Sequence, residues 1–338
     1  MRRELHADSH LLELPGFLRV RFLLWGVLLC LAGLVLAFVG VLLDIILSWL
    51  GIGSPVSQAW LAWTGGILTM LALAMVAAEI FLILPWRRLY PRRTEGDGFA
   101  VSGLTVALTA YNDEESIAPA VEDFLSYPLV KRVIVVSNNS KDRTFERAQE
   151  AGAIVFNETK PGYGQCVYRC LSEAAAYDDT ECVVLCEGDM TFRARDLTKL
   201  LAYLPHAEVV NGTRIVEQLR AYSTQLTTFM YYGNFFVGKL LEAKHFGKGT
   251  FADVGTTYKI LRRNALRGLL PQLNPAVNLE FNAHFLDTVL ASNLTLLECP
   301  ITFHARVGKS KGGNVNDFRA VQVGMRMIYG LLFGWKRT

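Results

Sequence analysis

Residues 183–191 read VVLCEGDMT, an apolar run that ends in two acids, Glu187 and Asp189, separated by one residue. The apolar part predicts a buried β-strand. Side chains two positions apart on a strand point the same way, so both carboxylates could reach one hard cation. Two acids after a strand are also common in ordinary turns. The pattern alone is therefore weak, and its meaning depends on the sequence around it.

Short apolar runs alternate with amphipathic stretches on both sides of this strand. The predicted strands are 104–109, 132–136, 153–156, 182–186 and 208–211, and the predicted helices are 114–125, 143–151, 164–176 and 194–204. Such alternation is typical of a parallel sheet covered by helices on both faces. Ligands of these sheets bind beyond the carboxyl ends of the strands. We therefore expect an α/β domain over residues 99–312, with its site in the loops after the strands.

Polar or glycine-rich loops follow four successive predicted strands. They are TAYNDEE (109–115), VVSNNSKDRT (135–144), KPGYG (160–164) and the segment with Glu187 and Asp189. A glycine turn before a helix suits close approach of the backbone to phosphate. Further along the chain come NGTR (211–214), DVGTTY (253–258) and ECPITFHARVGKSK (298–311). The cations of these segments could close over a diphosphate.

Two long apolar runs precede this domain. Residues 22–43 contain no charge and residues 59–84 contain only Glu79. Each is long enough to cross about 30 Å of hydrocarbon at about 1.5 Å per residue. A cleaved signal peptide is the alternative for the first run, but that run exceeds the usual apolar core of about 7–15 residues. We expect an N-terminal segment over 1–21 and a transmembrane hairpin over 22–88.

The distribution of arginines predicts the orientation of the hairpin. Four arginines precede the first apolar run, four follow the second, and the loop 51–58 carries no charge. The positive-inside rule then places both flanks in the cytoplasm. We expect an integral membrane protein whose α/β domain is cytoplasmic.

Two aromatic segments of the domain are candidates for contact with the bilayer. Residues 222–246 read either as a buried core helix or as a helix lying in the interface. Residues 325–335 are amphipathic and too short to span, so we expect 313–338 to form an interfacial segment. The net charge of +3 is too small to indicate nucleic acid. The six cysteines show no zinc-site spacing, which favours reduced thiols.

Together these motifs resemble family 2 glycosyltransferases of the GT-A fold, which has a Rossmann-like, mostly parallel sheet. Within that family the chain is similar to the polyprenyl-phosphate sugar synthases of the dolichol-phosphate mannose synthase type. The resemblance runs from about Leu104 to Lys311. Three positions depart from the family pattern: Glu187 replaces the first acid of the usual metal motif, and Ser137 and Asn138 replace two acids of the second loop. In addition, one residue of the family's C-terminal motif is missing between Arg306 and Gly308.

The resemblance implies a set of site residues. The implied donor-binding residues are Ala110, Tyr111, Asn112, Glu114, Asn138, Lys160, Gly162, Gly188, Lys309 and Lys311. The implied catalytic residues are Asp189, Arg214, Arg306 and Asp253. Glu187 and Asp189 would bind Mg²⁺ or Mn²⁺, with Thr191 contributing directly or through water.

The abundance of cations favours a phosphate acceptor. An alcohol needs a general base, whereas a lipid phosphate already carries an anionic oxygen at pH 7. We expect inverting transfer of one hexose from UDP- or GDP-hexose to a polyprenyl monophosphate at the cytoplasmic face of the membrane. One alternative is transfer to a hydroxyl of a lipid or growing glycan, with Asp253 or Glu280 as base. Another is a sugar-nucleotide-binding subunit without turnover.

Overall fold

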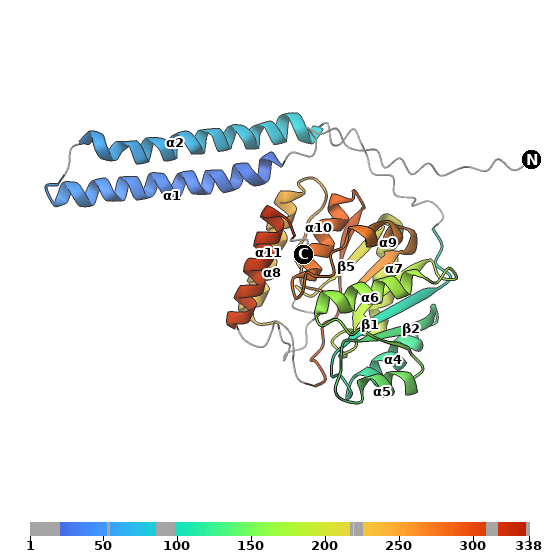
Figure 1. Cartoon of the computed structure of the whole chain (residues 1–338). Coiled ribbons are helices and arrows are strands. Elements are labelled where there is room, and N and C mark those ends of the chain that lie inside the picture. The colour runs from blue at the N-terminus through green and yellow to red at the C-terminus, as the bar shows by residue number, and fades with distance from the viewer. Residues whose placement is uncertain are drawn as a thin grey trace, which may run out of the picture. The chain divides into compact units, whose positions relative to one another are not determined.

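The computed structural model describes residues 21–52, 55–85, 99–216, 219, 226–308 and 317–335. The chain divides into two compact units, Met1–Pro91 and Arg92–Thr338 (Figure 1). The first holds the predicted hairpin and the second the predicted α/β domain.

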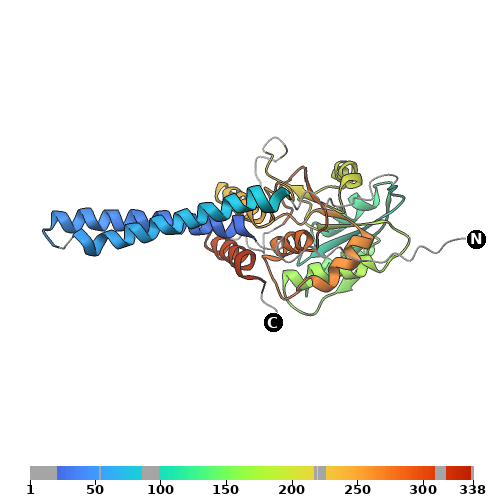
Figure 2. The same cartoon turned by 90° about the horizontal axis from the view of Figure 1, so that it is seen from above.

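The first unit is a pair of long antiparallel helices, α1 (Phe22–Trp49) and α2 (Pro55–Ala78) (Figure 2). A π-helical turn, Glu79–Ile83, continues α2. Both helices are long and apolar enough to cross a membrane, and only 17% of the most apolar stretch of each is buried. A core helix of a soluble domain would bury its apolar residues, whereas these residues face outward, as lipid-facing residues do.

Small residues set the distance between α1 and α2. A Cβ atom on Gly65 would lie 2.5 Å from the backbone oxygen of Gly33 and 2.5 Å from the backbone nitrogen of Ala37. The neighbouring Gly66 has open space at the same position. Lipid provides no hydrophobic drive for helix association, so this close backbone packing is the attraction that holds such a pair together.

Gly65→Val is therefore expected to push the two helices apart, at a cost of about 1–3 kcal/mol for overpacking. Gly66→Val is the matched control and should leave the pair unchanged. Spin labels at the exposed positions Val35 and Met70 of the full chain in lipid report the separation. Longer and broader distances only in the Gly65 variant are predicted, and equal distances in both variants would refute this packing.

The second unit is built on a seven-stranded sheet with the order β3-β2-β1-β4-β6-β5-β7. The strands are β1 (Leu104–Ala110), β2 (Val130–Ser137), β3 (Ile154–Asn157), β4 (Cys182–Glu187), β5 (Val209–Thr213), β6 (Lys259–Arg262) and β7 (Leu296–Pro300). β1 is parallel to β2 and β4, β2 to β3, and β5 to β7. β6 is antiparallel to both β4 and β5. The mostly parallel α/β sheet is confirmed, with β6 as its antiparallel member.

Helices cover both faces of the sheet. They are α4 (Ile117–Leu125), α5 (Thr144–Glu150), α6 (Tyr163–Ala175), α7 (Leu197–Tyr203), α8 (Thr228–Lys244), α9 (Arg263–Leu269), α10 (Phe281–Ala291) and α11 (Asp317–Phe333). One core lies between the sheet and α6, α8, α9, α10 and α11, and the other between the sheet and α4, α5 and α7 (Figure 1). Alternate residues of β4 serve the two cores: Val183 and Leu185 face the first, and Val184 the second.

Several elements differ from the sequence prediction. The expected helix 194–204 is divided into a 3₁₀ turn, Ala194–Asp196, the helix α7, and a second 3₁₀ turn, Leu204–His206. The helix expected over 222–246 begins at Thr228, capped by the Thr227 hydroxyl, and residues 222–225 lie outside the described ranges. β6 and α9 were not predicted. β6 has only four residues, two of them basic, which is too short for a clear alternation.

The register of the sheet brings three strand ends together. Ala110 of β1 lies opposite Ser137 of β2, and Thr109 of β1 lies opposite Glu187 of β4. The loops that follow β1, β2 and β4 therefore share one edge of the sheet, as the parallel arrangement predicts.

Candidate functional site

The turn after β4 places Asp189 in a buried position next to Glu187. The Gly188 amide donates to the Thr109 carbonyl at 3.0 Å, and a Cβ atom on Gly188 would lie 2.5 Å from Cδ1 of Ile117. A side chain at this position would have to displace the Ile117 side chain, so glycine allows the turn to pack closely on β1 and α4. Asp189 is 1% exposed, and its Oδ1 accepts from the Thr191 amide and hydroxyl at 3.0 and 2.5 Å. Thr191 therefore orients the carboxylate of Asp189.

The surroundings of Asp189 disfavour the charged form of its carboxyl group. Burial, and then the charge of Glu187, raise its pKa to about 7. Its Oδ2 is buried and accepts no hydrogen bond from the described residues, although Nη1 of Arg306 lies 3.1 Å away. A divalent cation relieves repulsion between two such carboxylates.

The donor atoms fit Mg²⁺ or Mn²⁺, which prefer oxygen ligands. Among the described residues, no group of three or more His, Cys, Asp or Glu side chains converges on one point. Glu187 and Asp189 would therefore supply two protein ligands, and oxygens of a bound phosphate or water would supply the others. Mg²⁺ is commonly bound in this way, through one or two carboxylates plus substrate phosphates.

Arg306 links the loops after β1 and β4. Its Nη2 donates to Asp113 Oδ1 at 3.0 Å, and its Nη1 forms the ion pair with Asp189. Burial alone would lower the pKa of Arg306, but Asp189 and Asp113 outweigh that effect and raise it. The segment that carries Arg306 is fixed by the Val307 amide, which donates to the Asp189 carbonyl at 3.1 Å. Arg306 is thus held between Asp113 and Asp189, and its contact with phosphate stays a prediction.

A chain of polar side chains supports Glu187 from behind. The Thr257 hydroxyl donates to Glu187 Oε1 at 2.6 Å and lies 2.5 Å from the Tyr163 hydroxyl. Asn282 donates to the Tyr163 hydroxyl at 3.1 Å and accepts from Lys259 Nζ at 3.2 Å. Lys259 is fully buried, and burial lowers its pKa to about 7. Glu187 is therefore oriented by Thr257, which is itself fixed by residues of α6 and α10.

The glycine turn before α6 is shaped by close packing. Gly162 has φ 129°, a conformation that favours glycine, and a Cβ atom on Gly164 would lie 1.7 Å from the Val277 carbonyl oxygen. The Gly162 amide donates to Asn138 Oδ1 at 3.0 Å, and the Tyr163 amide donates to Asn278 Oδ1 at 2.8 Å. Both amides donate to asparagine side chains, so the protein itself covers this side of the glycine turn.

The side chain of Asn138 organises a loop. Its Nδ2 donates to the carbonyls of Glu158 at 3.1 Å and Lys160 at 2.7 Å, while its Oδ1 accepts from Gly162. Every polar atom of the amide therefore has a backbone partner. This geometry is at odds with the implied role of the Asn138 side chain in binding the donor.

The loop after β1 is braced in a similar way. Asn112 Oδ1 accepts from the Lys141 amide at 2.7 Å, and Glu114 Oε2 accepts from the Arg143 amide at 3.1 Å. The Ala110 carbonyl accepts from the Asn138 amide, and Tyr111 is 45% exposed. These four residues lie at the predicted edge of the sheet, and their contacts to donor remain predictions. Lys160 is exposed at the same edge, and Lys309 and Lys311 lie outside the described residues.

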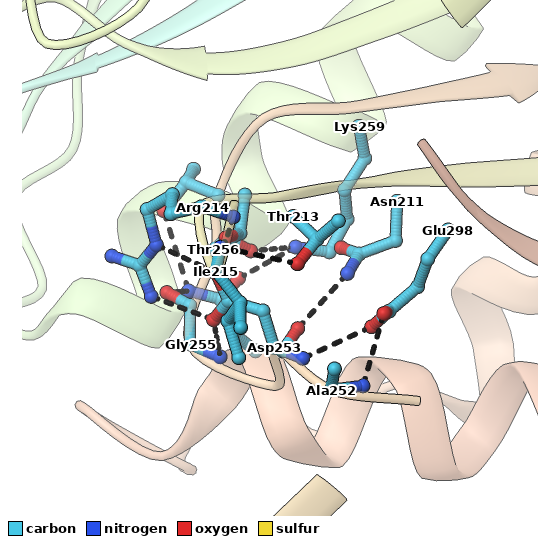
Figure 3. Close-up of polar contacts among 12 residues, drawn as sticks. Asn211, Thr213, Arg214, Ile215, Ala252, Asp253, Gly255, Thr256, Lys259 and Glu298 are labelled. Carbon is cyan, nitrogen blue, oxygen red and sulfur yellow. Dashed lines mark hydrogen bonds and ion pairs between the residues drawn. The ribbon is translucent and has the colours of Figure 1, made fainter. Parts of the chain in front are cut away.

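Arg214 and Asp253 form a buried ion pair (Figure 3). The Arg214 Nε and Nη2 atoms donate to Asp253 Oδ2 and Oδ1, each at 2.7 Å. The Thr256 hydroxyl and the Gly255 amide also donate to this carboxylate, at 2.6 and 3.1 Å. Glu298 of β7 fixes the loop by accepting from the Asp253 amide at 3.1 Å. Arg214 and its loop are thus held rigidly beside β5.

This geometry is at odds with Asp253 as a general base. Burial by itself would raise the pKa of Asp253, but Arg214 outweighs burial and lowers it to about 2. The Arg214 amide also donates to this carboxylate, at 3.0 Å, and a carboxylate with five donors and so low a pKa has little affinity for a proton. Asp253 instead positions Arg214.

Glu280, the other candidate base, has different surroundings. It lies directly before α10, and its Oε2 is buried with no hydrogen-bond partner among the described residues. Its neighbours in sequence, Asn278 and Asn282, contact Tyr163 of the glycine turn. Glu280 therefore belongs to the segment that packs against the candidate site.

Four residues of the site were missed by sequence reasoning. Asp113 stands in a run of acids after β1, a signal that could have marked it. Tyr163 was quoted only as part of the glycine turn, and Thr257 only as part of the 253–258 loop. Asn282 gave no signal, because its role depends on contacts between residues far apart in sequence.

Comparison with known proteins agrees with this geometry. Residues 105–270 match the family described as Glycosyl transferase family 2. An uncharacterized glycosyltransferase of Mycobacterium tuberculosis is 39% identical over 116 residues, which cover 34% of this chain and 50% of the relative. A dolichyl-phosphate hexose transferase of Haloferax volcanii is 26% identical over 214 residues, covering 63% and 88%. The chain thus spans about half the length of the first of these relatives.

A solved structure has the same fold. It is glucosyl-3-phosphoglycerate synthase from Mycobacterium tuberculosis, in complex with Mn²⁺, uridine diphosphate and phosphoglyceric acid. Its TM-score is 0.51 at 18% identity, covering 70% of this chain and 80% of the other. The sequence match and the mostly parallel sheet lead to one conclusion: residues 105–270 form a glycosyl transferase family 2 domain, and the second unit has the GT-A fold.

Proposed function

We propose that this protein transfers a hexose from a nucleotide-sugar to a polyprenyl monophosphate at the cytoplasmic face of a membrane. The observation that carries the proposal is the pair of buried Asp189 and half-buried Glu187, with Arg306 forming an ion pair with Asp189. Two carboxylates and a fixed guanidinium suit a metal-bound diphosphate. The similarity to a dolichyl-phosphate hexose transferase supports the acceptor, and the solved relative with Mn²⁺ and uridine diphosphate supports the donor.

The residues of the site have separate roles in the proposed reaction. A divalent cation bound by Glu187 and Asp189 would neutralise charge on the departing diphosphate. Arg306 lies against the same carboxylates, and its Nε is buried with no hydrogen-bond partner among the described residues, so it has a donor for a phosphate oxygen. Thr257 and Thr191 keep the two carboxylates aligned. An oxygen of the lipid phosphate attacks the anomeric carbon as the bond to the diphosphate breaks, which inverts the configuration.

The state of Asp253 supports a phosphate acceptor. A phosphate monoester has its second pKa near 6 and needs no proton removed before it attacks. Asp253, one of the two candidate bases, is held in a bidentate ion pair with Arg214. The second candidate function is transfer to a hydroxyl, and it is favoured by one observation, the buried and unpartnered Oε2 of Glu280.

Glu280→Gln separates the two acceptors. If the acceptor is a phosphate, we expect Glu280→Gln to change kcat by less than about tenfold, because the reaction needs no general base. For a hydroxyl acceptor, loss of a general base should lower kcat by about 10²–10⁴-fold. Single-turnover rates with saturating donor measure this, and the donor Kd serves as the control for an intact site. A loss above a hundredfold with unchanged donor binding would favour the hydroxyl acceptor.

The function itself is tested with the full chain purified into lipid nanodiscs. The protein is incubated with radiolabelled UDP- and GDP-hexoses and undecaprenyl phosphate, in Mg²⁺ or Mn²⁺ and in EDTA. We expect one donor to yield an organic-soluble product that EDTA abolishes and metal restores. Absence of product from every donor would contradict the proposal, as would product that EDTA does not affect.

A further inference from the structure

Two helices of the second unit expose aromatic stripes. On α8 the exposed residues Phe229, Tyr232 and Phe236 are 49%, 65% and 60% exposed, at spacings of three and four residues. The stripe on α11 consists of Phe318, Val321, Met325, Tyr329 and Phe333, which are 43–73% exposed. Such spacing places each set along one side of its helix. Water-facing helices normally carry polar residues there, so both outer faces are unusual for a soluble domain.

The two stripes lie on neighbouring helices that share one core. Val237 and Leu241 of α8 and Met327 and Leu331 of α11 are buried in the same cluster. α8 and α11 pack against each other (Figure 1). Because both helices turn their buried sides to that cluster, the two exposed stripes face away from it. We call the eight exposed residues of the two stripes the aromatic face.

A buried carboxylate fixes this arrangement. Asp287 of α10 accepts from Lys244 Nζ of α8 at 2.8 Å and lies 2.7 Å from Nε2 of His245. The indole of Trp335, just after α11, donates to the same carboxylate at 2.7 Å. The ends of α8 and α11 are therefore tied to α10. The buried side of α8 fits the prediction of a core helix for 222–246, and its exposed aromatic side is the kind that an interfacial helix would present.

We propose that the aromatic face docks the second unit on the membrane surface, with its side chains in the headgroup region. The inference rests on one part of the proposed function, that α1 and α2 cross the bilayer. Only residues 86–98 separate the described end of the hairpin from the second unit. At about 3.3–3.6 Å per residue they reach at most about 47 Å, which limits the distance between the end of the hairpin and Phe99, the first described residue of the second unit.

The residues around the α11 stripe fit lipid headgroups better than a protein partner. Arg319 and Arg326 lie beside this stripe, whereas Lys239 on α8 is paired with Glu242. Basic residues beside an aromatic stripe complement anionic phospholipids, and the stripe itself enters the interface by about 5–10 Å. Tyrosine and phenylalanine are also enriched at this depth.

Docking would bring the candidate site close to the membrane. A Cβ atom on Gly238 of α8 would lie 2.7 Å from the Phe251 carbonyl oxygen, so α8 packs directly on the loop that leads to Asp253. A Cβ atom on Gly255 would likewise lie 2.8 Å from Oδ1 of Asn234 on α8. The helix that meets the lipid is thus the helix that supports the loop holding Arg214.

The test uses the full chain in nanodiscs of mixed neutral and anionic phospholipid. A single cysteine at Met325, Phe236 or, as control, Glu150 of α5 carries an environment-sensitive fluorophore, in a Cys30→Ser background because the other cysteines are buried. Lipids brominated near the headgroup serve as quenchers. Resistance to alkaline extraction tests separately whether the hairpin crosses the membrane.

We expect strong quenching at positions 325 and 236 and none at 150. Absence of quenching at 325 and 236 in a chain that resists extraction would overturn the docking proposal while leaving the transmembrane hairpin intact. A blue shift without quenching would indicate a second copy of the chain on this face, and it would overturn the proposal too.

A second variant checks the consequence for function. Phe236→Ser with Met325→Ser should raise the KM for polyprenyl phosphate in bilayers, while the Kd for donor stays unchanged because neither residue lies in the donor loops. The paired control is Tyr203→Ser, an exposed aromatic on α7. Equal KM values for the double variant and the control would count against docking.

Discussion

Asp189→Asn is expected to lower the rate of hexose transfer by about a thousandfold, which corresponds to about 4 kcal/mol of transition-state stabilisation. Asparagine keeps the size of the side chain and an oxygen that accepts from Thr191. It removes one of the two negative charges that would hold the cation. The expected loss therefore reflects metal and diphosphate binding, and single-turnover rates together with the metal dependence of donor binding measure it.

The fold should survive this substitution. Asp189 is buried beside Glu187, so a neutral side chain of the same shape removes an unfavourable charge. We expect the Tm of the Asp189→Asn protein to stay within a few degrees of the parent. Asp179→Asn, which alters an exposed pair with Arg132, is the matched control and should retain full activity. An Asp189→Asn protein with unchanged metal dependence and rate would show that the carboxylate pair does not bind the metal.

Asp253→Ala is expected to destabilise the second unit by about 3–5 kcal/mol, because it leaves the Arg214 guanidinium buried without its partner. Removing both charges should cost less: Arg214→Met combined with Asp253→Leu replaces the pair by apolar groups of similar size. Glu150→Ala, in an exposed pair with Arg143, is the control and should cost less than about 1 kcal/mol. Chemical denaturation of the full chain in micelles measures the three variants against the parent.

The pH dependence of stability checks the same pair. Arg214 holds the pKa of Asp253 at about 2, below the ordinary value near 3.9. The contribution of this carboxylate is complete above the ordinary value and is lost as the pH falls toward 2. We expect the parent to lose more stability than the Asp253→Leu double variant between pH 5 and 3. Parallel curves, or a single Asp253→Ala variant as stable as the control, would show that Asp253 is not tied to Arg214.

Much of the site could be predicted because it lies at the ends of sequential strands. The acids after β4 and the polar loops after β1 and β2 follow runs whose alternation with helices indicates a parallel sheet. Parallel strands bring their carboxyl ends to one edge, so Glu187, Asp189 and the first loop could be placed together without knowledge of contacts.

The roles of single side chains could not be predicted in the same way. Arg306 meets Asp113 across 193 positions of sequence, and no local pattern shows such a pairing. Asn138 looked like a ligand-binding amide because its position matched the second loop, but the backbone of residues 158–162 uses all its polar atoms. Asp253 looked like a base for a similar reason. In each case a tertiary contact decided what the residue does.

The most direct test of the proposed phosphate acceptor compares two lipids that differ only in the phosphate. The nanodisc-bound protein is given its preferred labelled donor with metal, and either polyprenyl phosphate or the corresponding polyprenol. Mass spectrometry identifies the products. A polyprenyl phosphate hexose from the first lipid and no glycolipid from the second is the predicted result. Transfer to polyprenol or to an added saccharide, with none to the phosphate, would contradict it.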